Sequence, residues 1–372
     1  MSVPIRPLFV NENMGGHATL HLAIRSVLRD DPEVRAQFLD VPPAGTLRRV
    51  AAAPVPGLAR ADADLQALRV QLGTSAVVRR RLRSWPNPYD VIHVYSQNAG
   101  LLVDGILRDR PSVVGTDATT SQGALLLPHR RPARGTDRRV AVSQRFERRV
   151  YESATLVVAQ SEWAADSLRD EYGVDPTRIR RIPYGTTIPD ALPHVTRARP
   201  QITFVGFSME RKGGTRLLDL WQRSFRGDAD LNLVTRDDVP REPGLRVFRD
   251  FRPGDPRLRT LYAETDVLVF PSRIDTFGYA LVEAMAAEVP TVALAVAAVP
   301  EVVADGETGL LVDPAADDDT LAAAVARILD DPVRARAMGR AGRARALERF
   351  DARVTTARLV EVLREARALH GA

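Results

Sequence analysis

The stretch DVLVFPSRIDTFGYALVEAMAA, residues 266–287, decides the fold of this chain. Its first residues, Asp266 to Phe270, form a short, β-rich apolar run that is typical of a central strand in a parallel sheet. Pro271 and the polar residues after it end that run. From Gly278 on, strong helix formers predict a helix. A buried strand, a polar loop and a helix in this order favour an α/β fold built on parallel strands.

The same stretch carries two carboxylates eight residues apart, Asp275 in the loop and Glu283 inside the helix. A carboxylate about a turn and a half into an otherwise apolar helix costs free energy unless donors pair with it. The hydroxyl groups of a ribose or another sugar are suitable donors. The alternative is an ordinary strand-to-helix corner with two surface acids.

The run DTFGYALVEAMA resembles the signature of the retaining glycosyltransferases of family 4, or glycosyl transferases group 1, in which two acidic residues flank seven others around Phe-Gly. The resemblance implies the GT-B fold, two Rossmann-like domains facing across a cleft. It implies that Glu283 holds the ribose of a nucleotide diphosphate sugar, that Asp275 faces the sugar, and that Phe277, Gly278 and Tyr279 contact the donor. The family usually has Glu at the first acidic position, so the shorter Asp275 is a departure.

A second motif, ITFVGFSMERKGG at residues 202–214, predicts a strand, a loop and a helix start. Lys212 is the only lysine of the chain. A compact ammonium suits a crowded phosphate pocket better than a planar guanidinium does, although one remaining lysine must fall somewhere by chance. The resemblance implies that Lys212 and Arg211 bind the diphosphate and that Gly206 contacts the donor. Many family members have Arg where this chain has Phe207, so Arg211 is expected to supply the second charge.

The first strand, Leu8–Val10, runs into the sequence NENMGGH and then into a helix. A Gly-Gly turn before a helix N-terminus presents backbone N–H groups to a phosphate or a sugar, and a plain tight turn is the alternative. The resemblance favours Gly15 and Gly16 as donor or acceptor contacts. His17 is either a site residue or a neighbour of the helix N-cap.

Two further polar residues accompany the next predicted strands of the first half. Asp117 follows the strand Ser112–Gly115, near a position where family members frequently have a His that touches the donor sugar and the acceptor. The resemblance makes Asp117 a candidate catalytic residue, and a helix N-cap is an equal competitor. His93 lies inside a strand, where we expect a core residue with its hydrogen bonds satisfied.

Apolar periodicity and turn residues predict the remaining elements. Besides 266–270, strands are expected at residues 8–10, 90–96, 112–115, 156–159, 179–182, 202–205, 231–234, 246–248 and 291–294. Besides the helix after Gly278, helices are expected at residues 18–28, 62–83, 101–107, 138–153, 162–172, 256–263, 321–329, 333–349 and 352–369.

The length of 372 residues, 45% of them hydrophobic, is enough for two cores. We predict an N-terminal acceptor-binding Rossmann-like domain at 1–190 and a C-terminal nucleotide-sugar-binding Rossmann-like domain at 197–350. The proline-containing segment 186–200 is expected to link them. The resemblance implies that a C-terminal helix at 351–372 packs back toward the N-terminal domain.

The charge of the chain is unevenly distributed. Residues 1–200 carry 28 arginines against 20 acidic residues, whereas residues 201–372 carry 24 basic against 27 acidic residues. The densest basic clusters contain Arg79, Arg80, Arg81 and Arg83, and Arg130, Arg131, Arg134, Arg138, Arg139, Arg145, Arg148 and Arg149. They form either a solvated helix face or a surface that attracts an anionic acceptor or an anionic membrane. Nucleic acid is not expected as a partner, because aromatic residues do not interleave with the clusters.

The sequence contains no cysteine and no apolar run of about 18 residues. Disulfides, a thiolate nucleophile and cysteine metal sites are therefore excluded. The chain starts with a strand rather than with the pattern of a signal peptide, so we expect a cytoplasmic protein, with the inner face of the membrane as the alternative location. The acidic triplet Asp317–Asp319 is expected to begin a helix rather than to bind a metal.

The resemblance implies one function, that of a retaining, metal-independent hexosyltransferase. It moves a sugar from a UDP- or GDP-sugar to the hydroxyl of a small-molecule, glycan or lipid-linked acceptor, without a cofactor besides this donor. Catalysis would rest on charge, because the leaving diphosphate gains negative charge as the glycosidic bond breaks. The alternatives are a sugar-nucleotide epimerase or phosphorylase on the same fold, or a non-catalytic sugar-nucleotide-binding protein.

Overall fold

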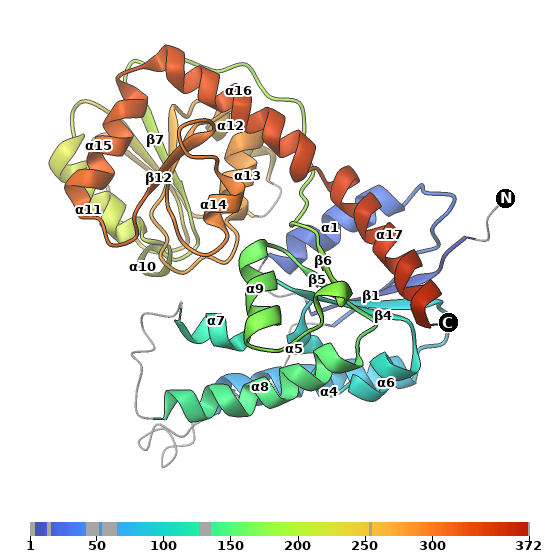
Figure 1. Ribbon diagram of the computed structural model, residues 1–372. Helices are drawn as coiled ribbons and strands as arrows, with labels where there is room; N and C mark the ends of the chain where they lie inside the picture. Colours follow the sequence, from blue (N-terminus) through green and yellow to red (C-terminus); the bar gives the residue numbers. More distant parts are fainter. Residues whose placement is uncertain are drawn as a thin grey trace. The chain divides into compact units, whose positions relative to one another are not determined.

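A computed structural model describes residues 4–12, 16–41, 52–53, 65–125, 135–252 and 255–370. The chain divides into two compact units, one formed by Met1–Gly185 with Ala352–Ala372 and the other by Thr186–Asp351. Each unit contains a six-stranded parallel sheet with helices on its faces. The predicted α/β fold with two Rossmann-like domains is confirmed (Figure 1).

The first unit contains the strand order β2-β1-β3-β4-β5-β6. Its strands are β1 (Pro7–Asn11), β2 (Gln37–Asp40), β3 (Val91–Val94), β4 (Ser112–Thr116), β5 (Leu156–Ala159) and β6 (Ile179–Arg181). Its helices are α1 (His17–Leu28), α4 (Gln66–Arg83), α5 (Gln97–Gly100), α6 (Asp104–Asp109), α7 (Thr120–Leu125), α8 (Thr136–Ser153), α9 (Glu162–Asp170), the 3-10 turn Pro176–Arg178 and α17 (Ala352–His370). Strand β2 was not predicted.

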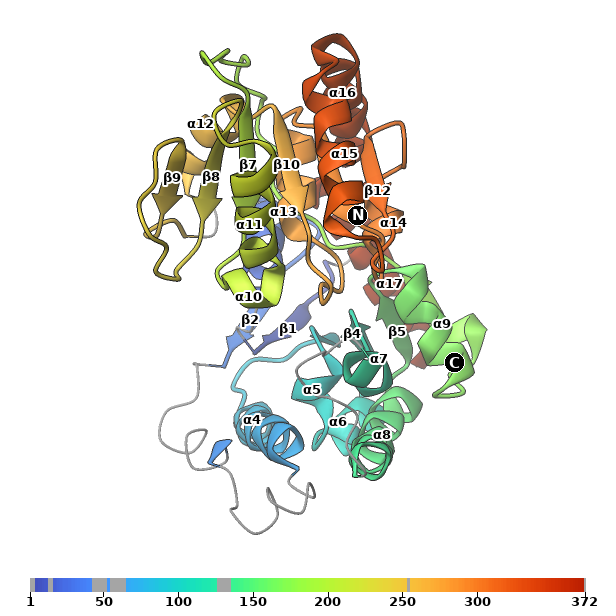
Figure 2. The same cartoon turned by 90° about the vertical axis from the view of Figure 1, so that its left-hand side faces the viewer.

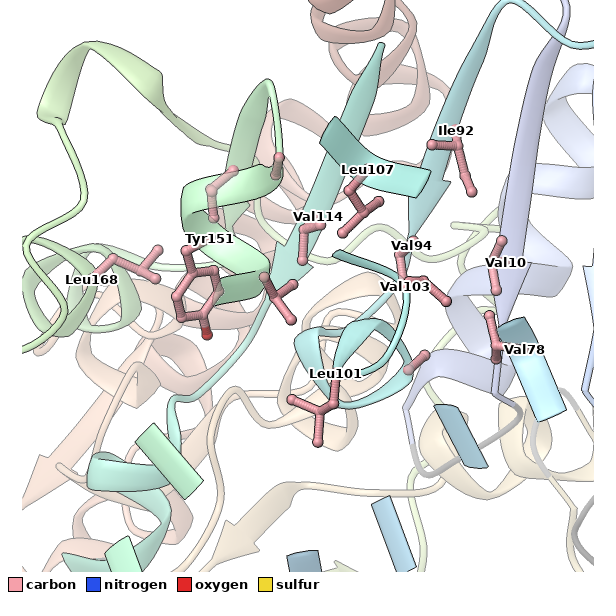
Figure 3. Packing of buried hydrophobic residues seen from close by; sticks show 14 of the residues in the cluster. Val10, Val78, Ile92, Val94, Leu101, Val103, Leu107, Val114, Tyr151 and Leu168 are labelled. Atoms are coloured by element: carbon pink, nitrogen blue, oxygen red, sulfur yellow. The ribbon is translucent and has the colours of Figure 1, made fainter. Parts of the chain in front are cut away.

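The core of the first unit forms between its sheet and one helical layer. Residues of β1, β3 and β4 are buried on both faces of the sheet, as is typical of central parallel strands. Figure 3 shows Val10, Val94 and Val114 packed with side chains from α4, α8 and the segment between α5 and α6. Helices α4, α5, α6 and α8 lie on this side of the sheet, and α1 and α17 lie on the other (Figure 1).

The C-terminal helix α17 belongs to the first unit although the second unit precedes it in the chain. It packs against α1, β3 and β4. Gly185 permits its close approach, because a Cβ at this position would lie 1.9 Å from Thr355 Oγ1. Arg180 pairs with Glu365, which also ties α17 to β6.

The second unit contains the strand order β12-β11-β10-β7-β8-β9. Its strands are β7 (Gln201–Val205), β8 (Asp230–Val234), β9 (Leu245–Phe248), β10 (Val267–Phe270), β11 (Thr291–Leu294) and β12 (Gly309–Val312). Its helices are α10 (Met209–Lys212), α11 (Gly214–Ser224), α12 (Pro256–Ala263), α13 (Tyr279–Ala286), α14 (Val299–Val302), α15 (Asp318–Leu329) and α16 (Pro332–Arg349). Residues 186–200 belong to this unit and form no helix or strand.

The order of the strands places a switch point between β7 and β10. The chain runs from β7 to β8 and β9 on one side, and then returns to pair β10 with the other side of β7. Figure 2 shows these four strands side by side, with α10 beyond the end of β7. The loops after β7 and β10 therefore diverge at the carboxyl edge of the sheet, where doubly wound folds bind their ligands.

Candidate functional site

The loop after β7 is shaped by glycines at three positions. A Cβ at Gly206 would lie 2.9 Å from the Cβ of Lys212, so only glycine lets α10 fold back on the end of β7. Gly213 has φ +79° and separates α10 from α11, and a Cβ there would lie 2.3 Å from the carbonyl oxygen of Pro271. A Cβ at Gly214 would contact Met209 Sδ at 2.6 Å. The sequence thus places the N-terminus of α11 against the loop that follows β10.

Lys212 lies at the junction of the two loops and forms an ion pair with Asp275. Their side chains are 17% and 14% exposed, respectively. The other carboxylate oxygen of Asp275 accepts a hydrogen bond from the N–H of Gly278 at 3.1 Å. Asp275 therefore fixes both the ammonium group and the start of α13. Without a ligand, the carboxylate of Asp275 neutralises the charge of Lys212. A bound anion would compete with this carboxylate for the ammonium group.

Glu283 lies in the second turn of α13, where the sequence predicted a paired carboxylate. Glu283 is half-buried, and it forms no hydrogen bond or ion pair with another residue of the described ranges. Burial raises the pKa of Glu283 to about 7. Its charge also contributes to raising the pKa of buried Tyr262 on α12, after the larger effect of burial, so the two side chains are neighbours. A carboxylate that lacks a hydrogen-bond donor in the protein can accept hydrogen bonds from a ligand.

The residues between the two carboxylates are held by the turn and by aromatic packing. Gly278 has φ +91°, a backbone conformation that favours glycine, and it precedes the first residue of α13. The ring of Phe277 is buried and packs edge-on against Tyr279 and Phe350, with ring centroids 5.9 and 5.8 Å apart. Phe277 is therefore a packing residue of the loop as well as part of the predicted donor site.

Arg211, the predicted second phosphate ligand, is exposed on α10. Its backbone N–H donates to the Oγ of Ser208 at 3.4 Å, which caps this short helix. The guanidinium forms no ion pair within the described part of the chain. Arg211 shares α10 with Lys212, but no residue of the described ranges forms an ion pair with its side chain.

The first unit has its own polar cluster at the carboxyl ends of β1 and β3. Gly16 lies just before α1, whereas Gly15 falls outside the described residues. His17 Nδ1 is 3.0 Å from Glu12 Oε1, and His17 Nε2 is 2.8 Å from the hydroxyl of Tyr184. Ser96 donates to the same oxygen of Glu12 at 2.6 Å. His17 is thus a member of a buried network and not a mere neighbour of the helix cap.

The network changes the proton affinity of His17. Burial lowers the pKa of His17, but the hydrogen bond and the charge of Glu12, helped by Asp117, outweigh burial and raise this pKa above its usual value. Asp117 directly follows β4, at the carboxyl edge of the same sheet. Thr119 is the residue that accepts from the N–H of Gln122 at 3.3 Å at the start of α7. The N-cap alternative for Asp117 is therefore wrong.

Glu147 on α8 anchors the loop that carries Asp117. Its carboxylate accepts from the N–H and hydroxyl of Thr120, at 3.1 and 2.8 Å, and from Gln97 at 3.1 Å. Tyr172 donates to its second oxygen. Burial raises the pKa of Glu147, although these hydrogen bonds oppose the effect. The sequence did not reveal this anchor, because its three partners come from separate segments of the chain.

His93 is a core residue, as predicted. It is buried in β3, and its Nδ1 is 3.2 Å from the carbonyl oxygen of Val113 on the neighbouring strand. Burial lowers the pKa of His93 to about 4, so the ring is neutral near pH 7.

Within the second unit the structure brings together Gly206, Lys212, Asp275 and Gly278, with Glu283 one helical turn further along α13. Gly16, His17 and Asp117 gather at the carboxyl edge of the other sheet. Glu12, Ser96 and Tyr184 belong to that second cluster and were missed. The only signal for them in the sequence is that Glu12 comes shortly after the predicted strand Leu8–Val10 and that Ser96 is the last residue of the predicted strand 90–96.

Neither a metal-binding cluster nor a membrane-spanning helix is found in the described ranges. They contain no group of three or more His, Asp or Glu side chains placed to hold a metal ion. Asp317 caps α15 through the N–H of Thr320 at 2.9 Å, and Asp318 pairs with Arg216 and Arg223, so the acidic triplet is part of a helix start as predicted. Of the helices in these ranges, none has the length and hydropathy needed to span a bilayer.

Comparison with known proteins gives matches over both units. Residues 15–185 match a family described as Glycosyl transferase 4-like domain, and residues 247–345 match Glycosyl transferases group 1. A D-inositol 3-phosphate glycosyltransferase from Geodermatophilus obscurus is 30% identical over 340 residues, which span 82% of this chain and 72% of that protein. An MMP alpha-(1->4)-mannosyltransferase from Mycolicibacterium hassiacum is 33% identical over 239 residues, 61% of this chain and 57% of that protein.

Solved structures agree with these matches at the level of the fold. The structure of Anabaena Alr3699/HepE in complex with UDP-glucose superposes with a TM-score of 0.68 at 19% sequence identity. The superposition covers 97% of this chain and all of the other. At this identity the likeness establishes the shared fold alone.

Proposed function

Since this chain belongs to the group 1 glycosyltransferases, we propose that it is a retaining enzyme that transfers a hexose from a UDP- or GDP-sugar to an acceptor hydroxyl. The observation that carries the proposal is the combination at the carboxyl edge of the second sheet. A partly buried cation, Lys212, lies between the loops of the switch point, and Glu283 presents a carboxylate that has no hydrogen-bond donor in the described ranges. A nucleoside diphosphate supplies the matching groups, an anion and a ribose diol.

In the proposed reaction the bond between the anomeric carbon and the diphosphate oxygen breaks while the acceptor oxygen bonds to the same face of the sugar. The acceptor proton passes to the departing phosphate oxygen. Lys212 and the N-terminus of α11 stabilise the negative charge that develops on the diphosphate. Asp275, which holds Lys212 in the free protein, faces the donor sugar once the diphosphate has taken over the ammonium group.

The donor is identified by thermal shift with UDP, GDP and their hexose derivatives, because a ligand that binds only the folded state stabilises it. Incubation of the donor that stabilises the protein with candidate acceptors, followed by NMR of the product, then gives the anomeric configuration. We expect the configuration of the donor to be retained, at a rate unaffected by EDTA. An inverted product, or a requirement for added metal, would contradict the proposal.

For the acceptor we propose an anionic compound or a lipid-linked acceptor at a negatively charged membrane. Exposed arginines lie on two helices that share one side of the first sheet (Figure 1). Arg138, Arg145 and Arg149 are spaced by seven and four residues, which places them on one face of α8. Arg148 is not part of this face, because its guanidinium donates to the carbonyl of Tyr172 at 3.0 Å. Arg130, Arg131 and Arg134 lie outside the described residues.

The membrane form of this proposal predicts pelleting with vesicles that contain phosphatidylserine at low ionic strength, and release as salt is added. Replacing Arg138, Arg145 and Arg149 together by Glu should abolish pelleting. A matched control is the same change at three exposed arginines of α16, Arg334, Arg336 and Arg340. Equal pelleting of both triple variants, or no pelleting of the wild-type protein at low salt, would favour a soluble anionic acceptor.

A further inference from the structure

The exposed ring of Phe207, just after β7, contacts the guanidinium of Arg236, which follows the neighbouring strand β8. Phe207 is 39% exposed, although it directly follows the glycine that packs against Lys212. The guanidinium carbon of Arg236, which follows β8, lies 4.3 Å from the centre of the Phe207 ring. A cation at this distance is held by the ring face. The pair therefore places a positive charge beside the loop that contains Lys212.

Three hydrogen bonds join the backbones that carry this pair. The N–H of Arg236 and the hydroxyl of Thr235 donate to the carbonyl oxygen of Phe207, at 3.3 and 3.5 Å. The N–H of Met209, at the start of α10, donates to Asp237 Oδ2 at 2.7 Å. The loop after β8 is thus joined to the loop after β7. The guanidinium of Arg236 lies against the ring of Phe207, whereas the guanidinium of Arg211 forms no ion pair in the described ranges.

The charges around Arg236 leave it available for an anion. Within the described ranges it takes part in no ion pair. Of the two acids that follow it, Asp238 pairs with Arg249, and Asp237 accepts the N–H of Met209. Lys212 is matched by Asp275. A diphosphate carries more negative charge than one ammonium group neutralises, so this edge of the sheet needs a second cation.

We propose that Arg236 is that second cation and binds the diphosphate of the nucleotide together with Lys212. This inference rests on the proposed function and extends it to a residue on a different strand. Phe207 acts as a positioning residue, since its ring keeps the guanidinium at the edge of the site and its carbonyl fixes the loop. The assignment also changes the expectation for Arg211, whose exposed side chain has no ion-pair partner in the described ranges and is the weaker candidate for this role.

Calorimetry with UDP, uridine, GDP and guanosine tests the assignment. For the diphosphate that the wild-type protein binds, Arg236→Ala should lower the affinity by about tenfold and leave binding of the matching nucleoside unchanged. Phe207→Leu should cause a smaller loss, because it removes the ring and keeps the charge. Arg241→Ala is the control, since Arg241 is exposed in the loop between β8 and β9 and has no part in the site. It should bind the diphosphate like the wild-type protein.

A variant that returns the positive charge from a different position distinguishes a loss of diphosphate binding from a loss of folding. Phe207→Arg in the Arg236→Ala background returns a guanidinium to the same edge and should restore most of the lost affinity. The inference is overturned if the wild-type protein binds UDP or GDP and Arg236→Ala binds it equally well, or if the variant loses nucleoside and diphosphate binding in parallel. Failure of the wild-type protein to bind either diphosphate would instead contradict the proposed function itself.

Discussion

Replacing Lys212 by alanine is expected to reduce the rate of sugar transfer by about 100-fold or more, the scale of losing one preorganised stabiliser of transition-state charge. The loss should fall mainly on kcat, because negative charge develops on the diphosphate as the glycosidic bond breaks. The measurement is steady-state transfer with the donor identified by thermal shift. Circular dichroism of the variant shows whether the fold is kept.

Two variants make this result specific to Lys212. Lys212→Arg keeps the charge but replaces a compact ammonium by a planar fork, so its activity should lie between those of the wild-type protein and Lys212→Ala. Asp275→Asn removes the partner that holds Lys212 in the free protein. It should bind the nucleoside diphosphate at least as tightly as the wild-type protein while transfer falls. Near-normal transfer by Lys212→Ala would remove the diphosphate assignment.

Replacing Glu283 by glutamine is expected to weaken nucleotide binding without unfolding the chain. A carboxylate accepts two ribose hydroxyls more strongly than an amide does. Because burial raises the pKa of Glu283 to about 7, the wild-type protein should also lose affinity as the pH falls through this value, whereas the variant should not. Calorimetry between pH 6 and 8 checks both effects, with Glu307→Gln, an exposed acid before β12, as the control.

Glu283→Gln should increase the stability of the folded protein, although it weakens nucleotide binding. The pKa of Glu283 is raised on folding, so the folded protein binds the proton more tightly than the unfolded chain, and stability falls as the pH rises from about 4.5 toward 7. Glu283→Gln avoids this loss. At pH 8 the variant should be more stable by on the order of 1–3 kcal/mol, seen as a rise in Tm of a few degrees. Identical nucleotide affinities of the two proteins would reject the ribose role, and a lower Tm of the variant would show that Glu283 is a structural acid.

Local patterns were sufficient to predict most strands and helices, since buried parallel strands and strong helix formers leave a clear signal. The region after β3 shows where they were not. A single helix at 101–107 was predicted, but the structure has α5 at Gln97–Gly100 and α6 at Asp104–Asp109. A Cβ at Gly100 would lie 2.9 Å from Val150 Cγ1, so the close packing of α8 determines where α5 lies. Tertiary packing overrides local preference at this point.

In the candidate site, too, local motifs could be predicted from the sequence, whereas contacts between distant segments could not. The motifs around Lys212, Asp275 and Glu283 could be read from the sequence, because each lies in one strand-loop-helix unit. Their pairing could not, since Lys212 and Asp275 are 63 residues apart and meet only because β7 and β10 are neighbours. Arg236 was missed for the same reason. Its role depends on the ring of Phe207, which follows another strand, and a lone arginine after a strand gives no signal of its own.

The most direct test of the account is a crystal structure of the wild-type protein with UDP or GDP, whichever stabilises it in thermal shift. The account predicts the diphosphate within hydrogen-bond distance of Lys212 Nζ at the switch point of the second sheet, with both ribose hydroxyls on the carboxylate of Glu283. A nucleotide bound elsewhere, with Lys212 still paired to Asp275 and Glu283 without a partner, would contradict it.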